Sequence, residues 1–237
     1  MLLNKLFSAL TALLLAAVFV LIVFACNNAI LKPAISQAIL SPTIIIDAGH
    51  GSPDGGTTGV NGVVEKDINL AIAVKTAELL KFGGYNVIMT RKDDQSLADS
   101  DLHTIRKKKV DDMNKRLGII NSTPNSIFVS IHQNYYEGYS QGAQMFHGKK
   151  NESSKILAQT MQDTFKELIQ PENHRKIKSS DRSLYLLENA ESTAVMIECG
   201  FLSDYTESRL LATNEYQSKI AFCIYASITD FVTQNQM

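Results

Sequence analysis

Four side chains that can bind a metal or carry a proton stand far apart in the sequence: His50, Glu65, His132 and Glu198. Two imidazoles and one carboxylate form a ligand set of hydrolytic zinc sites, which keep a fourth position for water. Such an ion lowers the pKa of its water to about 7. The second carboxylate can take a proton from the water and pass it to a leaving nitrogen. These residue types therefore suit metal-assisted hydrolysis.

The elements around these residues would bring them together. The β-branched run Thr43–Asp47 predicts a strand buried on both faces, and His50 follows it. His132 ends the expected strand 126–132, and Glu198 ends the expected strand 192–198. Glu65 opens a helix that stops at Gly83. Because catalytic groups gather beyond the carboxyl ends of parallel strands, all four should meet at one edge of a sheet.

The remaining pattern fixes the fold class. Strands and helices alternate along the chain, which favours βαβ units and a parallel sheet. We expect an α/β fold, a single domain with a mainly parallel twisted sheet flanked by helices, preceded by one N-terminal hydrophobic helix. The other expected strands are 85–90 and 143–147, and the other expected helices are 109–121, 153–169, 207–211 and 216–232.

The amino-terminal region differs from the rest. Residues Leu6 to Ala25 carry no charge, and as a helix they would be about 30 Å long, enough to cross a bilayer. We assign residues 1–26 to a signal peptide or membrane anchor, 27–42 to a linker and 43–237 to the catalytic domain. The length of the stretch and the bulky Phe24 favour an uncleaved anchor over a cleaved signal. Lipid attachment at Cys26 is a third option, and all three place the domain outside the cytoplasm.

Composition excludes two other classes of protein. The 237 residues have a formal net charge of −1 with interspersed charges, so no clustered basic face for nucleic acid is expected. The basic run 106–109 is followed by Asp111 and Asp112, and we interpret it as a solvated helix start. Beyond Cys26 there are only Cys199 and Cys223, which is not a disulfide framework.

Four sequence blocks resemble a known family. Residues Asp47–Gly51, Glu65–Leu70, Ser130–Asn134 and Ile197–Ser203 resemble the zinc-dependent N-acetylmuramoyl-L-alanine amidases, in that family's order and spacing. The resemblance covers about Thr43 to Val232. Within the family the chain looks most like the germination-specific branch, which acts on the spore cortex.

The resemblance implies roles for the four residues. His50, Glu65 and His132 would bind Zn²⁺, and Glu198 would be the catalytic carboxylate. The bond cut would be the amide between the lactyl group of N-acetylmuramic acid and L-alanine in peptidoglycan. In the spore cortex this removes stem peptides on the way to muramic-δ-lactam. One departure is Tyr135, followed by Tyr136, where the family usually has a small residue.

Other interpretations stay open at this point. His50 could be a turn residue between two glycines, and Glu65 could serve only the macrodipole of its helix. A zinc carboxypeptidase also uses two histidines and one glutamate, and a non-catalytic wall-binding module could share the fold.

Expected partners are peptidoglycan, the membrane through the N-terminal segment and an accessory protein. Asp47 could steady His50, and Arg91 could orient a carboxylate or cap its strand.

Overall fold

The computed structural model describes residues 14–23 and 41–235. Its contacts divide the chain into two units, Met1–Ser41 and Pro42–Met237. Residues 14–23 are helical, while the rest of the expected apolar segment and nearly all of the expected linker lie outside the described residues. Within the described part of the chain, no helix combines the length and apolarity that crossing a membrane requires.

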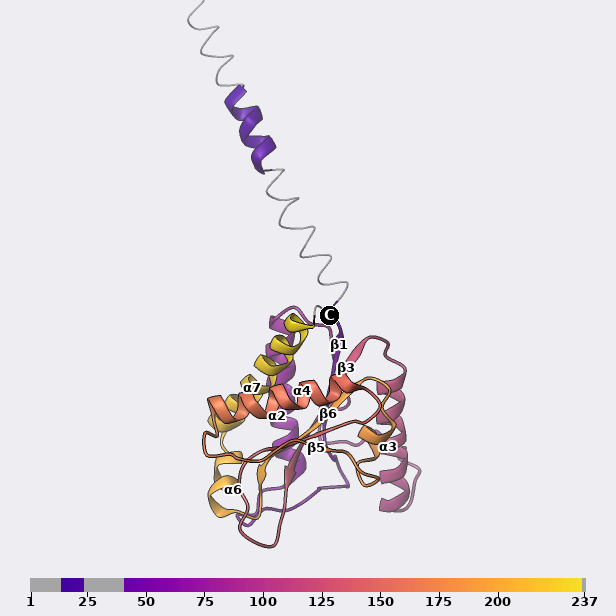
Figure 1. The fold of residues 1–237 in the computed structure, drawn as a ribbon. Coiled ribbons are helices and arrows are strands. Elements are labelled where there is room, and N and C mark those ends of the chain that lie inside the picture. The colour runs from indigo at the N-terminus through magenta and orange to yellow at the C-terminus, as the bar shows by residue number, and fades with distance from the viewer. Residues whose placement is uncertain (1–13, 24–40, 236–237) are drawn as a thin grey trace, which may run out of the picture. The chain divides into compact units, whose positions relative to one another are not determined.

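The second unit is built on a six-stranded sheet, which confirms the predicted α/β class (Figure 1). All neighbouring strands pair in parallel except β4 and β6, which are antiparallel. In sheet order the strands are β2 (Val87–Met89), β1 (Thr43–Ala48), β3 (Ser126–Asn134), β6 (Thr193–Phe201), β4 (Gln144–His147) and β5 (Lys178–Ser179).

Helices cover both faces of this sheet. Alternate residues of a strand point to opposite faces, so Ile44 and Ile46 pack with one core cluster and Ile45 with the other. The first face carries α2 (Glu65–Phe82), α4 (Glu152–Leu168) and α7 (Asn214–Gln234). The second carries α3 (Ile105–Asn121) and α5 (Tyr185–Asn189), and α6 (Tyr205–Leu211) follows β6. Burial on both faces explains the continuous apolar run of β1.

Some predicted boundaries were wrong. Helix α3 begins at Ile105, four residues before the predicted start, because the hydroxyl of Thr104 accepts a hydrogen bond from the backbone N–H of Lys107. A threonine in this position satisfies one of the free N–H groups of the first helical turn. The basic run therefore lies inside the helix. Strand β5 and helix α5 were not predicted.

Candidate active site

The four predicted site residues meet at the carboxyl edge of the sheet, where they line one cavity. His132 on β3 and Glu198 on β6 are direct register partners. His50 follows β1, and Glu65 is the first residue of α2. One ligand atom from each of His50, Glu65 and His132 can be chosen so that all three lie within 4.8 Å of one another.

Glu65 lies between the two imidazoles. Its Oε1 is 3.0 Å from His132 Nδ1, and its Oε2 is 3.2 Å from His50 Nε2. The backbone N–H groups of Thr57 and Gln133 also donate to this carboxylate, at 2.9 and 3.1 Å. Burial alone would raise the pKa of Glu65, but the two histidines outweigh it and hold the pKa well below its usual range. The carboxylate is therefore ionised and fixed.

His50 sits in a tight loop with a positive φ of 63°. Its Nδ1 lies 2.9 Å from Asp54 Oδ2, which orients the ring toward Glu65. Burial opposes protonation of His50, but the hydrogen bonds to Asp54 and Glu65 raise its pKa to about 9. The preceding Gly49 is required for close packing, since a Cβ there would lie 2.2 Å from the His132 ring.

Two buried arginines hold the backbone of this loop. Arg91 donates to the carbonyl oxygens of Ala48 and Gly49, at 2.9 and 3.0 Å. Arg116 on α3 donates to those of Ala48 and His50, at 2.9 and 2.6 Å. Arg91 thus holds the loop backbone, and among the described residues it donates to backbone carbonyl oxygens and to no carboxylate. Three successive carbonyl groups, those of Ala48, Gly49 and His50, therefore accept hydrogen bonds from buried cations.

Arg116 is fully buried and neutralised by two carboxylates. Its guanidinium contacts Asp47 and Asp112. Ser130 and Thr90 also donate hydrogen bonds to Asp47. Asp47 therefore supports the His50 loop through Arg116. Sequence reasoning did not single out Arg116, although its spacing of four from Asp112 was a signal of a helical ion pair.

Glu198 is the fourth member of the group. Its Oε2 is buried and has no hydrogen-bond partner among the described residues. Burial raises the pKa of Glu198 to about 7, although the charge of nearby His132 opposes the shift. A carboxylate with this pKa can accept and return a proton near neutral pH. The adjacent Cys199 points to the other face of the sheet, where burial raises the pKa of its thiol, so it is no nucleophile.

A cavity of about 410 Å³ opens over these groups. Most of its walls are polar or charged. Tyr135 lines it, as does Lys109 from α3, whose Nζ is 3.1 Å from Asp54 Oδ2. The interpretation of the basic run as a solvated helix start was therefore incomplete, because Lys109 reaches the cavity. The lining residues are His50, Asp54, Gly56, Thr57, Glu65, Lys109, His132, Gln133, Asn134, Tyr135 and Glu198.

The donor set fits a zinc ion. Two imidazoles and one fixed carboxylate converge, as in three-ligand zinc sites that leave a position open. The carboxylates of Asp54 and Glu65 lie 2.9 and 3.2 Å from the two ring nitrogens of His50, so their negative charge favours a cation here. Asp54 on His50 is the kind of outer hydrogen bond that orients metal-binding histidines.

Two histidines and two glutamates at the carboxyl edge of the sheet of an α/β domain can carry out metal-assisted hydrolysis. Comparison with known families gives the class directly. Residues 44–230 match the family described as N-acetylmuramoyl-L-alanine amidase. The chain belongs to this family of enzymes.

Individual relatives agree with this assignment. The germination-specific N-acetylmuramoyl-L-alanine amidase of Bacillus subtilis is 33% identical over 209 residues, covering 88% of this chain and 86% of that protein. The CwlD amidase from Clostridioides difficile, solved in complex with the GerS lipoprotein, is 40% identical. It superposes with a TM-score of 0.79 over 82% of this chain and all of that chain. An N-acetylmuramoyl-L-alanine amidase from Clostridium difficile 630 is 28% identical, with a TM-score of 0.69 over 81% and 97% of the two chains.

Proposed function

We propose that this chain hydrolyses the amide between N-acetylmuramic acid and L-alanine with a zinc ion held by His50, Glu65 and His132. Glu198 is the proposed catalytic carboxylate. The observation that carries the proposal is the position of Glu198, which is the register partner of His132 and has a buried oxygen without a hydrogen-bond partner in the described part of the chain.

The residues divide the chemistry between them. When bound, zinc supplies a Lewis acid that polarises the scissile carbonyl and acidifies the attacking water. Glu198, with a pKa of about 7, accepts the proton of that water and returns it to the leaving nitrogen. Glu65 is held ionised by its hydrogen bonds, and Asp54 keeps the His50 ring in place. Arg91 and Arg116 hold the backbone of the loop that carries His50.

Spore-cortex peptidoglycan is the proposed substrate. The supporting finding is the similarity to a protein named as germination-specific and to the CwlD amidase. Removal of stem peptides would prepare the cortex glycan for conversion to muramic-δ-lactam. Because peptidoglycan lies outside the cytoplasmic membrane, we infer that residues 1–26 act as a signal or anchor, 27–42 as a linker and 43–237 as the catalytic domain.

An accessory protein is a further part of the proposal. The CwlD amidase was solved in complex with a lipoprotein, and this chain is similar to it along the whole of that enzyme's solved chain. A partner held at the membrane surface would raise the local concentration of the amidase near its substrate. If the purified enzyme alone cleaves cortex as fast as the enzyme does in sporulating cells, no accessory protein is needed and this part of the proposal fails.

Zinc content measured together with product mass tests the function. We expect one zinc per chain and the release of whole stem peptides that begin with L-alanine. Release of single residues from the other end of the peptide would instead identify a carboxypeptidase. Stoichiometric wall binding without any product would identify a non-catalytic module, and absence of zinc would contradict the ligand assignment.

A further inference from the structure

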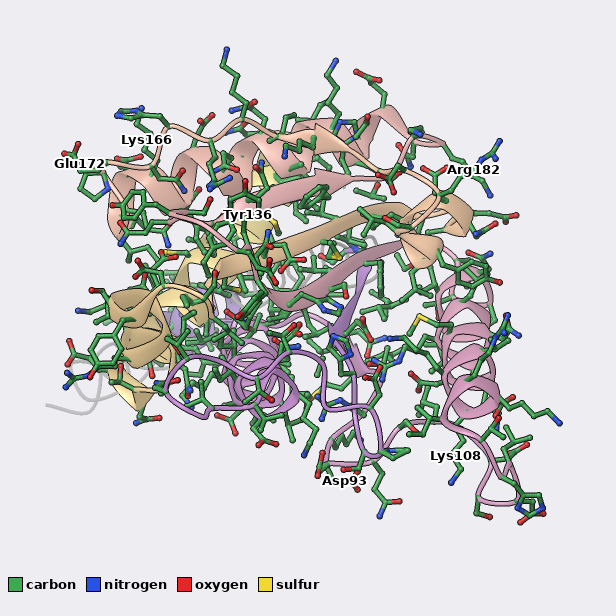
Figure 2. The ribbon with its side chains drawn as sticks, turned by 90° about the horizontal axis from the view of Figure 1, so that it is seen from below. Asp93, Lys108, Tyr136, Lys166, Glu172 and Arg182 are labelled. Carbon is green, nitrogen blue, oxygen red and sulfur yellow. The ribbon has the colours of Figure 1, made fainter. Side chains whose placement is uncertain are left out.

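We propose that Lys109 binds a carboxylate of the stem peptide, so that the enzyme selects peptides with a free acidic group directly after L-alanine. The inference rests on the proposed function and adds a recognition site to it. Lys109 lies in the first half of α3 and lines the cavity together with the four site residues. Figure 2 labels its neighbour Lys108 near one end of α3.

The position of Lys109 relative to the reacting groups supports this role. Its Nζ is 3.1 Å from Asp54 Oδ2, and the same oxygen is 2.9 Å from His50 Nδ1. The ammonium group is thus two short contacts away from a proposed zinc ligand. An extended peptide advances about 3.3–3.6 Å per residue, so a group two residues from the scissile carbonyl lies about 7 Å away. A carboxylate on the residue after L-alanine would therefore lie close enough to the Lys109 ammonium group to contact it.

Lys109 is also available for a ligand. Its side chain is 54% exposed, and an exposed ion pair such as the one with Asp54 contributes little to stability. Asp54 keeps other partners, His50 Nδ1 and the backbone N–H of Gly56. An ammonium group has three N–H donors, so Lys109 can contact Asp54 and a substrate carboxylate together.

The charge pattern of the cavity gives this contact its selectivity. Lys109 is the only lysine or arginine among the described residues that line the cavity. Asp54 and Glu198 are the carboxylates of this lining outside the proposed ligand set. A peptide carboxylate beside the proposed zinc site can form an ion pair with Lys109, whereas a carboxamide at the same position offers only a neutral oxygen, which accepts a weaker hydrogen bond.

Two muramyl peptides that differ only in this group test the inference, one with a free carboxylate and one with a carboxamide after L-alanine. We expect the unaltered enzyme to cleave the carboxylate form with a kcat/KM about tenfold higher. Lys109→Met should reduce this ratio to about one, while Lys109→Arg should largely preserve it. The matched control is Lys107→Met, which removes the same charge from an exposed site on α3 outside the cavity and should leave the ratio unchanged.

Binding of the released peptides gives a second readout that needs no turnover. By calorimetry, Lys109→Met should weaken binding of the carboxylate product about tenfold and leave the carboxamide product unaffected. An equal loss for both substrates would overturn the inference, since Lys109 would then act only through Asp54 and His50. Equal cleavage of both by the unaltered enzyme would also overturn it while the amidase function stands. Cleavage of neither would contradict the function itself and the inference with it.

Discussion

Arg116 donates a hydrogen bond of 2.6 Å from its Nη2 to the backbone carbonyl oxygen of His50. The same guanidinium is fully buried and contacts the carboxylates of Asp47 and Asp112. One buried cation thus joins α3, the end of β1 and the loop that carries His50. Stability and the placement of His50 therefore depend on the same residue.

Replacing Arg116 should destabilise the domain strongly. Arg116→Met leaves two buried carboxylates without their partner, which typically costs about 3–5 kcal/mol. Urea unfolding measures this free energy. Arg106→Met, at an exposed position near the start of the same helix, is the matched control and should change it by less than about 0.5 kcal/mol. Equal effects of the two substitutions would contradict the role of Arg116.

Stability should fall in acid through Asp47. Burial opposes ionisation of Asp47, but Arg116, Ser130 and Thr90 outweigh it and lower its pKa below the usual 3.8. The unfolded chain then binds more protons in acid, so this stabilisation is present above about pH 4 and lost as pH falls through the folded-state pKa. Urea unfolding at about pH 6 and about pH 3 should show a shallower decline for Asp47→Asn than for the unaltered protein. Parallel declines would argue against this assignment.

A methyl group at Gly49 should weaken zinc binding. A Cβ at Gly49 would lie 2.2–2.7 Å from atoms of the His132 ring, so the ring must move. Gly49→Ala should therefore lower zinc content after dialysis against a chelator. Gly118→Ala is the control, because nothing lies within 4 Å of its Cβ position on α3. It should keep its zinc and gain about 0.5–1 kcal/mol of stability. Full zinc retention by Gly49→Ala would count against His132 as a ligand.

Removing the partner of His50 should also reduce zinc affinity. In Asp54→Asn the His50 ring loses a charged hydrogen-bond acceptor, and such changes cost about 10–100-fold in metal affinity. Competition with a zinc-binding dye measures the dissociation constant. Asp67→Asn makes the same chemical change at an exposed site in the first turn of α2 and should leave zinc affinity unaltered. Identical affinities for both variants would rule out the orienting role.

Glu198 should be needed for turnover and not for zinc. Glu198→Gln keeps the shape of the side chain but cannot accept a proton, so kcat should fall about 10²–10⁴-fold at unchanged zinc content. Glu191→Gln, at an exposed position just before β6, should retain full activity. Undiminished cleavage by Glu198→Gln would contradict the proposed mechanism. Loss of zinc from this variant would instead indicate that Glu198 is a metal ligand.

The convergence of the site residues at one edge of the sheet could be predicted because it follows from short local sequence patterns. The apolar run Ile44–Ile46 is followed by Asp47, Ala48 and Gly49, and His132 and Glu198 each end an apolar run. Once the strands are parallel, their carboxyl ends meet, and the residues at or near those ends must converge, although β3 and β6 continue two and three residues past His132 and Glu198. The structure brings these residues together as expected.

The support around this edge was not predictable from sequence patterns. Lys109 and Arg116 look like ordinary charged residues of an exposed helix, and their roles arise only when α3 packs beside the His50 loop. The Thr104 cap moves the start of α3 by four residues, a shift that the basic run obscures. Strand β5 and helix α5 have two and five residues, too short for a periodic signal.

The polar character of the cavity has a consequence for inhibitors of this enzyme. Most small-molecule sites gain affinity from apolar walls, and here Tyr135 is the only large hydrophobic residue among the described lining residues. An effective inhibitor would instead combine a zinc-chelating head with an anionic arm directed at Lys109.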